Sequence, residues 1–319
     1  MYISPAELEA AIEPREPAAI TLRNLLECGV HFGHQTARWN PKMAPFIYGA
    51  RNGIHIINLP RTISSWETAR RAIVEVVSRG GSVLFVGTKK QAQDAVVTEA
   101  RRCGAHYVSR RWLGGMMTNF QTIRKSIARM SKLEEILSEE ERAQQDGTGS
   151  RYTKKERLMM SRERDKLYYS LGGIKDMYAA PQLMFVIDIR REDIAIREAK
   201  RLDIPVVALV DTNCDPTAVT HAIPSNDDGT RAVRLFCEAV ADAVMEGRKV
   251  YNERKSAMEG GGDVQSSVRG RRSSRGADKG GAQATAAASS TTSEPAAESP
   301  AAEASETPDA GEAAGSKQE

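Results

Sequence analysis

The feature that most constrains the fold of this chain is a set of short apolar runs separated by amphipathic segments. Residues 82–87, 183–189 and 205–211 are rich in Val, Ile, Leu and Phe. A run that is apolar at nearly every position is typical of a strand buried on both faces in a parallel sheet. Strands that alternate with helical patterns predict an α/β fold, with right-handed crossovers and helices on both faces of the sheet.

The segments between these runs repeat their apolar residues at helical spacing. In the first of them, Ile63, Trp66, Ala69 and Ile73 recur every three or four positions, and a Gly-Gly pair follows at positions 80 and 81. Such spacing predicts an amphipathic helix that ends before the glycines. We predict helices over residues 22–28, 60–78, 89–103, 191–202 and 230–251, and a further strand over residues 106–111.

The pattern changes from Asn119 onward. Phe120, Ile123 and Ile127 begin an apolar series with charges between its members, and a second series at heptad-compatible spacing ends at Leu171. A polar, Gly-containing segment separates the two series. We predict an antiparallel coiled-coil hairpin over residues 119–171, inserted into an α/β domain formed by residues 19–118 and 172–255.

Both ends of the chain differ from this domain in composition. Residues 1–18 are predicted to be an exposed extension. From Gly260 the chain is dominated by Gly, Ser, Ala, Thr and Glu, with no aromatic residue. Such a segment cannot bury enough apolar surface to offset the entropy cost of ordering, so residues 256–319 are predicted to be a disordered tail.

The net charge of +3 is distributed unevenly. Residues 260–319 hold 6 Lys and Arg against 9 Asp and Glu, whereas residues 1–259 hold 39 against 33. A mild excess of positive charge in residues 1–259 favours a polyanionic partner, although many enzymes are as basic.

Several features predict a cytoplasmic protein. The four cysteines form no Cys-x-x-Cys pair, which suits reduced thiols. The N-terminus carries Pro5, Pro14 and Pro17, unlike a signal peptide. No apolar run approaches the roughly 20 residues that a membrane helix needs.

Residues 25–62 combine aromatic, basic and histidine residues with turn formers. Residues 46–59 predict two strands with a turn at Asn52-Gly53, a dipeptide that tolerates the left-handed conformations of tight hairpins. Cys28, His31 and His34 show a spacing compatible with metal binding, and a structural zinc would need a fourth ligand such as Cys103 or His106. The alternative is a buried cysteine beside two hydrogen-bonded histidines.

A nucleotide site is a second hypothesis, since ligands of such sheets bind beyond the carboxyl ends of the strands. Gly87, Thr88, Lys89 and Lys90 follow a predicted strand, but they match neither standard phosphate-binding pattern. Thr88 also suits an ordinary helix cap. An anion such as an RNA phosphate at Lys89 and Lys90 fits better than a bound nucleotide, and no cofactor is expected.

Catalysis has little support in the sequence. Asp188 and Asp211 end two predicted strands, where a catalytic carboxylate could lie. Arg190 and Arg191 follow Asp188 and are expected to keep its pKa low. No Ser or Cys with a nearby His resembles an activated nucleophile. We therefore expect no enzymatic activity and no small-molecule substrate.

Basic and aromatic residues at loops and element ends predict contact with RNA. Arg pairs with phosphate through two hydrogen bonds, and Trp can stack on bases. Trp66 is expected in the core, whereas Trp39 and Trp112 could belong to either the core or a binding surface. The predicted RNA-contacting residues are Arg38, Trp39, Lys42, Arg51, Lys89, Lys90, Arg110, Arg111, Arg124 and Lys125.

Several long blocks resemble one family. They are GVHFGHQTARWNPKMAPFIYGARNGIHIINLPRT (residues 29–62), VLFVGTKKQAQ (83–93), RRWLGGMMTNF (110–120), LGGIKDM (171–177), IPVVALVDTNCDP (204–216) and IPSNDDG (223–229). In this order they resemble the bacterial small-ribosomal-subunit protein two family over about residues 20–253. The N-terminal extension and the long tail depart from the family pattern.

The resemblance implies a Rossmann-like domain with a protruding coiled-coil hairpin. It implies a structural role on the small subunit, with small-subunit rRNA and neighbouring proteins as partners. Among these is the large multi-domain protein one, which would be docked for mRNA binding. The rival hypotheses are a nucleotide-dependent enzyme and a protein–protein adaptor that works through its coiled coil.

Overall fold

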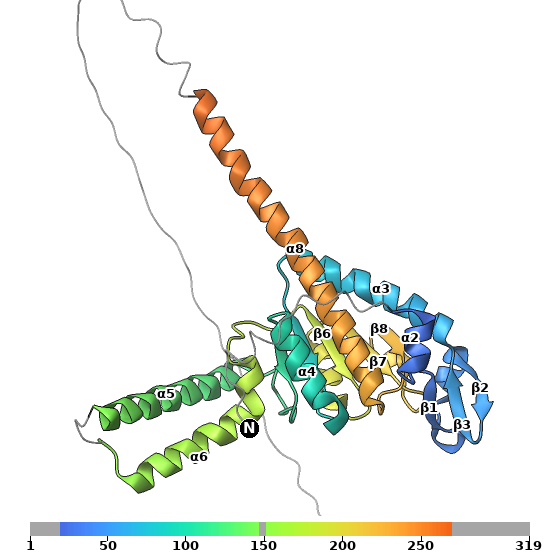
Figure 1. Ribbon diagram of the computed structural model, residues 1–319, viewed down its shortest axis with the longest axis horizontal. Coiled ribbons are helices and arrows are strands. Elements are labelled where there is room, and N and C mark those ends of the chain that lie inside the picture. Colours follow the sequence, from blue (N-terminus) through green and yellow to red (C-terminus); the bar gives the residue numbers. More distant parts are fainter. Residues whose placement is uncertain (1–19, 147–150, 270–319) are drawn as a thin grey trace, which may run out of the picture. The chain divides into compact units, whose positions relative to one another are not determined.

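A five-stranded parallel sheet forms the centre of the fold. The structure, a computed structural model, describes residues 20–146 and 151–269. The strand order is β5-β4-β6-β7-β8, and every neighbouring pair is parallel. Strands β6, β7 and β8 are labelled in Figure 1. The prediction of a parallel sheet is confirmed. The strands are β4 (Val83–Val86), β5 (His106–Val108), β6 (Leu183–Ile187), β7 (Val206–Val210) and β8 (His221–Pro224).

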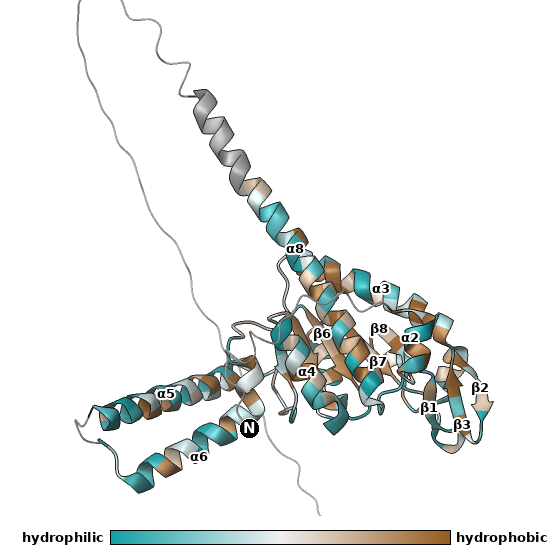
Figure 2. Cartoon of the chain, in the orientation of Figure 1, coloured by the Kyte–Doolittle hydropathy of each residue, from teal (hydrophilic) through white to brown (hydrophobic). Residues whose placement is uncertain are grey.

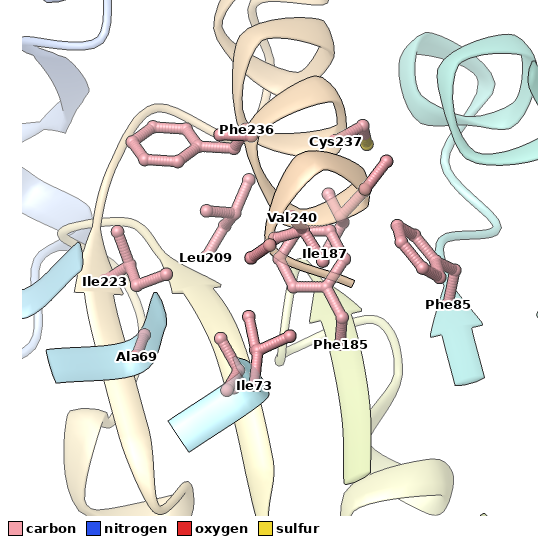
Figure 3. Packing of buried hydrophobic residues seen from close by; sticks show 14 of the residues in the cluster. Ala69, Ile73, Phe85, Phe185, Ile187, Leu209, Ile223, Phe236, Cys237 and Val240 are labelled. Carbon is pink, nitrogen blue, oxygen red and sulfur yellow. The ribbon is translucent and has the colours of Figure 1, made fainter. Parts of the chain in front are cut away.

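Helices cover both faces of this sheet because successive strand residues point to opposite sides. In β4, Phe85 belongs to one buried cluster and Leu84 to the other. On the first face, Phe85 and Phe185 pack beneath Phe236 and Val240 of helix α8 (Figure 3). The helices of this face are α3 (Leu59–Ser78), α4 (Lys90–Arg102) and α8 (Thr230–Arg269).

The second face carries helix α7 (Asp193–Arg201), the 3-10 turn η2 (Pro41–Phe46) and the foot of a helical pair. Met43 of η2 and Ile196 of α7 pack in this cluster beside Met184 of β6. Both faces of the sheet are therefore buried, as the continuous apolar strands predict.

A second, smaller sheet is built from residues 32–57. Its order is β1-β3-β2, and both pairings are antiparallel. The turn between β2 (Ile47–Arg51) and β3 (Ile54–Ile57) holds Asn52 at φ 53° and Gly53 at φ 74°, which confirms the predicted hairpin. Strand β1 (Phe32–Gln35) was not predicted, because a short sequence with Gly and His lacks a strand pattern. Helix α2 (Leu22–Glu27) precedes it, capped by Thr21.

Helices α5 (Phe120–Gln145) and α6 (Lys154–Leu171) lie along each other as a pair (Figure 1). Thr153 and Glu156 form a capping box at the start of α6. An Arg129–Glu163 ion pair at 3.0 Å joins the two helices. Brown apolar bands alternate with teal polar ones along both (Figure 2). The helical pair is confirmed, whereas its packing as a coiled coil stays a prediction.

Some element bounds differ from the predictions. Thr88 does not cap α4: the N-cap is Lys89, and the Thr88 hydroxyl is bonded elsewhere. Strand β8 was missed because His221–Pro224 ends in proline, which only an edge strand tolerates. Helix α8 continues beyond Tyr251 to Arg269, so residues 256–269, which were predicted to be disordered, are helical in the structure. Good helix formers at residues 253–257 favour the first part of this continuation. The predicted N-terminal extension and the tail beyond Arg269 lie outside the described residues.

Three short 3-10 turns are the remaining elements of the described residues: η1 (Thr36–Arg38), η3 (Gly172–Ile174) and η4 (Pro216–Ala218).

Candidate functional site

Charged side chains gather at the carboxyl end of the parallel sheet. Asp188 follows β6 and Asp211 follows β7, as the sequence predicts. Lys89 follows β4, and its ammonium nitrogen lies 2.8 Å from Asp227 and 2.6 Å from Asp228. Asp188 is 3.5 Å from the same nitrogen. The sheet end is thus an ion-pair network centred on one lysine.

Burial and like charge perturb the acids of this network. Burial, together with the nearby carboxylates Asp188 and Asp211, raises the pKa of Asp227 to about 7 against the lowering effect of Lys89. Burial also acts to lower the pKa of Lys89, but its hydrogen bonds to Asp227 and Asp228 outweigh this, so its pKa is raised. Lys89 is therefore held as a cation within the protein.

This network bears on the prediction that Lys89 contacts an RNA phosphate, which stays a prediction. The Lys89 side chain is only 12% exposed and is already paired with carboxylates. The neighbouring backbone N–H and hydroxyl of Thr88 donate to Glu192 at 3.0 and 2.5 Å. A phosphate placed here would meet buried acids, so the arrangement disfavours both an RNA phosphate and a nucleotide phosphate.

The stretch around His34 covers the same end of the sheet. His34 Nδ1 lies 3.1 Å from Asp211, and its backbone N–H donates to the hydroxyl of Thr212 at 2.8 Å. A Cβ on Gly33 would lie 2.6 Å from Thr212, so glycine permits this close approach. The hydrogen bond with Asp211 raises the pKa of His34. The stretch around His34 therefore packs against the residues that follow β7 at this end of the sheet.

The residues that could hold a metal differ from those predicted. His34, Asp211 and Asp227 place one ligand atom each within 4.8 Å of one another. Asp188, Cys214 and Asp227 form a second group of this kind. An imidazole with two carboxylates suits a divalent cation such as Zn²⁺. In the described ranges, Cys28 and His31 join neither group, so the predicted set of Cys28, His31 and His34 is not brought together.

The fourth ligands suggested for that set are also elsewhere. Cys103 is buried in the core on the α8 side of the sheet. His106 lies in the edge strand β5, where burial lowers its pKa. Burial likewise lowers the pKa of His31. Of the alternative, a buried cysteine beside two hydrogen-bonded histidines, the structure shows a bonded His34, but Cys28 is only partly buried and His31 Nδ1 has no hydrogen-bond partner in the described part of the chain.

A second buried carboxylate organises the loop that leads to α5. Glu198 on α7 is 7% exposed. One of its oxygens accepts from the Trp112 indole at 3.0 Å and from the Gly115 backbone at 2.8 Å. The other accepts from Met117 and from the backbone and hydroxyl of Thr118. Trp112 is therefore a core residue, which resolves one of the alternatives left by the sequence.

Burial acts to raise the pKa of Glu198. The hydrogen bonds from Thr118, Trp112, Met117 and Gly115 outweigh that effect and hold its pKa below the usual value of 4.5. Charge-assisted bonds of this kind are stronger than neutral ones. Glu198 was missed because a glutamate inside an amphipathic helix normally marks an exposed position.

The remaining predicted RNA-contacting residues occupy two regions. Near the small sheet, Arg38 and Arg51 are exposed. Trp39 is 39% exposed, with its ring centroid 5.2 Å from that of His55. Lys42 is exposed too, but its ammonium pairs with Asp215 at 2.6 Å. Among the described residues, Arg38 and Arg51 have no carboxylate partner, so this region offers two cations beside the accessible ring of Trp39.

The other region lies at the foot of the helical pair. Arg110 donates to Gln93 at 2.7 Å and lies over the ring of Tyr169 at 5.5 Å. Arg111 follows it and is exposed. Arg124 and Lys125 are exposed in the first turns of α5. Lys90 stands apart from both regions, exposed at the start of α4.

No helix within the described ranges combines the length and apolar composition needed to cross a membrane.

The sequence profile of one family spans most of the fold. The profile of "Ribosomal protein S2" matches residues 25–247. The chain belongs to the ribosomal protein S2 family. The matched residues include every position predicted to contact RNA, together with Glu198 and the carboxylates at the sheet end.

Individual members of this family are similar to this chain over most of its length. The "Small ribosomal subunit protein uS2" of Oleidesulfovibrio alaskensis is 56% identical over 239 residues, covering 75% of this chain and 89% of the relative. The protein of the same name from Xanthobacter autotrophicus is 57% identical over 227 residues, covering 71% of this chain and 66% of the relative. The shared part is thus the α/β domain with its helical pair.

Proposed function

We propose that the chain is a structural, rRNA-binding constituent of the small ribosomal subunit in the cytoplasm. The observation that carries this proposal is the family match over residues 25–247, with relatives named as small-subunit proteins. The structure supports a binding role over a catalytic one, because the lysine and the acids at the end of the sheet are paired with one another.

The physical basis of RNA binding is the replacement of counterions. Arg38, Arg51, Arg111, Arg124 and Lys125 are exposed, and each can release a cation from an RNA phosphate. The rigid domain fixes where these charges point. Recognition is expected to follow RNA shape more than base identity, since A-form grooves hide the base edges from side chains.

We further propose that the chain helps to dock the large multi-domain small-subunit protein one. The family resemblance supports this, and exposed apolar side chains make a protein contact plausible. Tyr48 is 80% exposed, Phe32 49%, and Leu22 and Leu26 are about half exposed. Exposed apolar side chains in one part of a surface often mark protein contacts.

Charge reversal at the foot of the helical pair tests the RNA-binding role. The R110E/R111E variant should lower the occupancy of the protein in purified small subunits several-fold, measured by quantitative mass spectrometry. A matched control is R71E/R79E, an exposed arginine of α3 and the exposed arginine that caps its C-terminus, on the opposite face of the sheet. Unchanged occupancy of R110E/R111E would remove these two residues from the proposed interface.

A further inference from the structure

Helix α7 has two faces with different chemistry. Ala195, Ile196, Glu198 and Ala199 are buried. At 100° per residue, the opposite side of the helix carries the other five positions. These five residues are all exposed: Asp193, Ile194, Arg197, Lys200 and Arg201.

The exposed face and its approach segment are strongly basic. Residues 190–203 contain five Arg and Lys against four Asp and Glu. Two of the acids, Glu192 and Glu198, are buried and accept hydrogen bonds inside the protein. Only Asp193 and Asp203 remain on the surface to balance the cations Arg190, Arg191, Arg197, Lys200 and Arg201.

Most of these cations are free to meet a partner. Arg197 pairs with Asp193 one turn earlier, and Arg191 donates to the Thr88 hydroxyl at 3.0 Å. Among the described residues, no ion pair involves Arg190, Lys200 or Arg201, and all three are exposed. An exposed positive surface of this kind suits a polyanion.

We propose that the exposed face of α7 and the segment before it, with Arg190, Lys200 and Arg201 as the principal cations, bind the phosphate backbone of small-subunit rRNA. This inference rests on the proposed function and adds a surface that the loop-based prediction did not contain. The face carries Ile194 and Leu202 as its only exposed large apolar side chains. That is too little for the apolar centre of a protein interface, so charge favours RNA.

The inner face of the same helix connects this surface to the foot of the helical pair. The Glu198 carboxylate accepts hydrogen bonds from Trp112, Gly115, Met117 and Thr118. These residues directly follow Arg110 and Arg111 in the chain. Helix α7 and the loop that follows the arginine pair are therefore fixed to one another through a buried carboxylate.

The test compares two triple variants of the full chain with equal loss of charge. The first is R190Q/K200Q/R201Q. The control is R71Q/R231Q/K249Q, three exposed cations of α3 and α8 on the opposite face of the sheet. The dissociation constant for a small-subunit rRNA transcript is measured at four salt concentrations, and thermal unfolding verifies that both variants are folded.

The expected result is a loss of affinity of about ten-fold or more at low salt for the α7 variant. The slope of log K against log salt should become shallower by about 1–3, because each phosphate contact contributes about 0.7–0.9. The control should keep the wild-type slope. Equal losses in both variants, or none in the α7 variant, would overturn the inference and leave the proposed function standing. Absence of RNA binding by the wild type would overturn both.

Discussion

At the scale of single residues, Glu198 shows how one buried carboxylate can organise a loop. Both of its oxygens accept hydrogen bonds, five in total, from the loop between β5 and α5. Glu192 plays a similar part for Thr88. Each carboxylate satisfies backbone donors that would otherwise be buried without a partner, which is costly.

Replacing Glu198 with glutamine tests this role. In the E198Q variant an amide NH₂ faces donors that had bonded a carboxylate oxygen. We expect a loss of about 2–4 kcal/mol in the free energy of unfolding, measured by urea denaturation. The control is E163Q, which breaks an exposed ion pair and should change the stability little. Equal stability of E198Q and wild type would contradict the proposed role.

The same carboxylate predicts a pH dependence. The folded-state pKa of Glu198 lies below its usual value of 4.5, so the unfolded chain takes up its proton first as the pH falls. The stabilisation is complete above the unfolded pKa and is lost as the pH falls toward the folded pKa. Urea unfolding between pH 6 and 3 should show a steeper acid loss for wild type than for E198Q. Parallel curves would assign the acid sensitivity to other groups.

At the scale of elements, the foot of the helical pair packs against the edge of the sheet. The 3-10 turn η3 follows α6 and lies over β5. A Cβ on Gly173 would lie 2.1 Å from the carbonyl oxygen of Tyr107. Glycine is therefore required for the close approach of two backbones, and this contact covers an edge strand that would otherwise be open.

A pair of alanine substitutions separates this close contact from a general effect of glycine. G173A must push η3 away from β5, and we expect a loss of about 1–3 kcal/mol in unfolding free energy. At Gly114, a Cβ would meet no atom within 4 Å, so G114A should be neutral or stabilising by up to about 1 kcal/mol. Thermal unfolding of both variants is the measurement. If G173A is as stable as G114A, then η3 can move away from β5 at little cost in free energy.

At the scale of the whole molecule, the described part of the chain has two core clusters separated by the sheet. The foot of the helical pair belongs to one of them through Ile127 and Leu171. Farther along α5, Met130, Leu133 and Leu137 are buried but belong to neither cluster. The distal part of the pair therefore has a local apolar contact of its own.

This separation predicts that the distal helices can be shortened without unfolding the domain. Replacing residues 136–157 with a short Gly-rich turn keeps the foot residues in place. The unfolding free energy, followed by Trp fluorescence in denaturant, should change by less than about 1 kcal/mol because the removed contacts are distant from the sheet. A loss of cooperative unfolding would show that the distal helices support the core.

The elements were readable from the sequence to different degrees. The buried strands β4, β6 and β7 and the helices around them have continuous or periodic apolar patterns, which local sequence expresses directly. Strands β1 and β8 are short, and one contains Pro224, so pairing with a neighbour rather than local preference makes them strands. The predicted RNA-contact residues at loops were chosen by residue type. The basic face of α7 was not singled out, because its cations are spaced as in any amphipathic helix.

The sequence by itself determined the parallel sheet, the helical pair and the family, because these rest on periodicity and on long ordered blocks. Only the tertiary structure shows which residues each charged side chain pairs with. From the sequence, Lys89 is expected to bind phosphate, whereas in the structure it pairs with Asp188, Asp227 and Asp228. From the sequence, His34 could share a metal with Cys28, whereas in the structure it lies beside Asp211. A side chain's charge environment is set by residues distant in the chain, and folding alone brings those together.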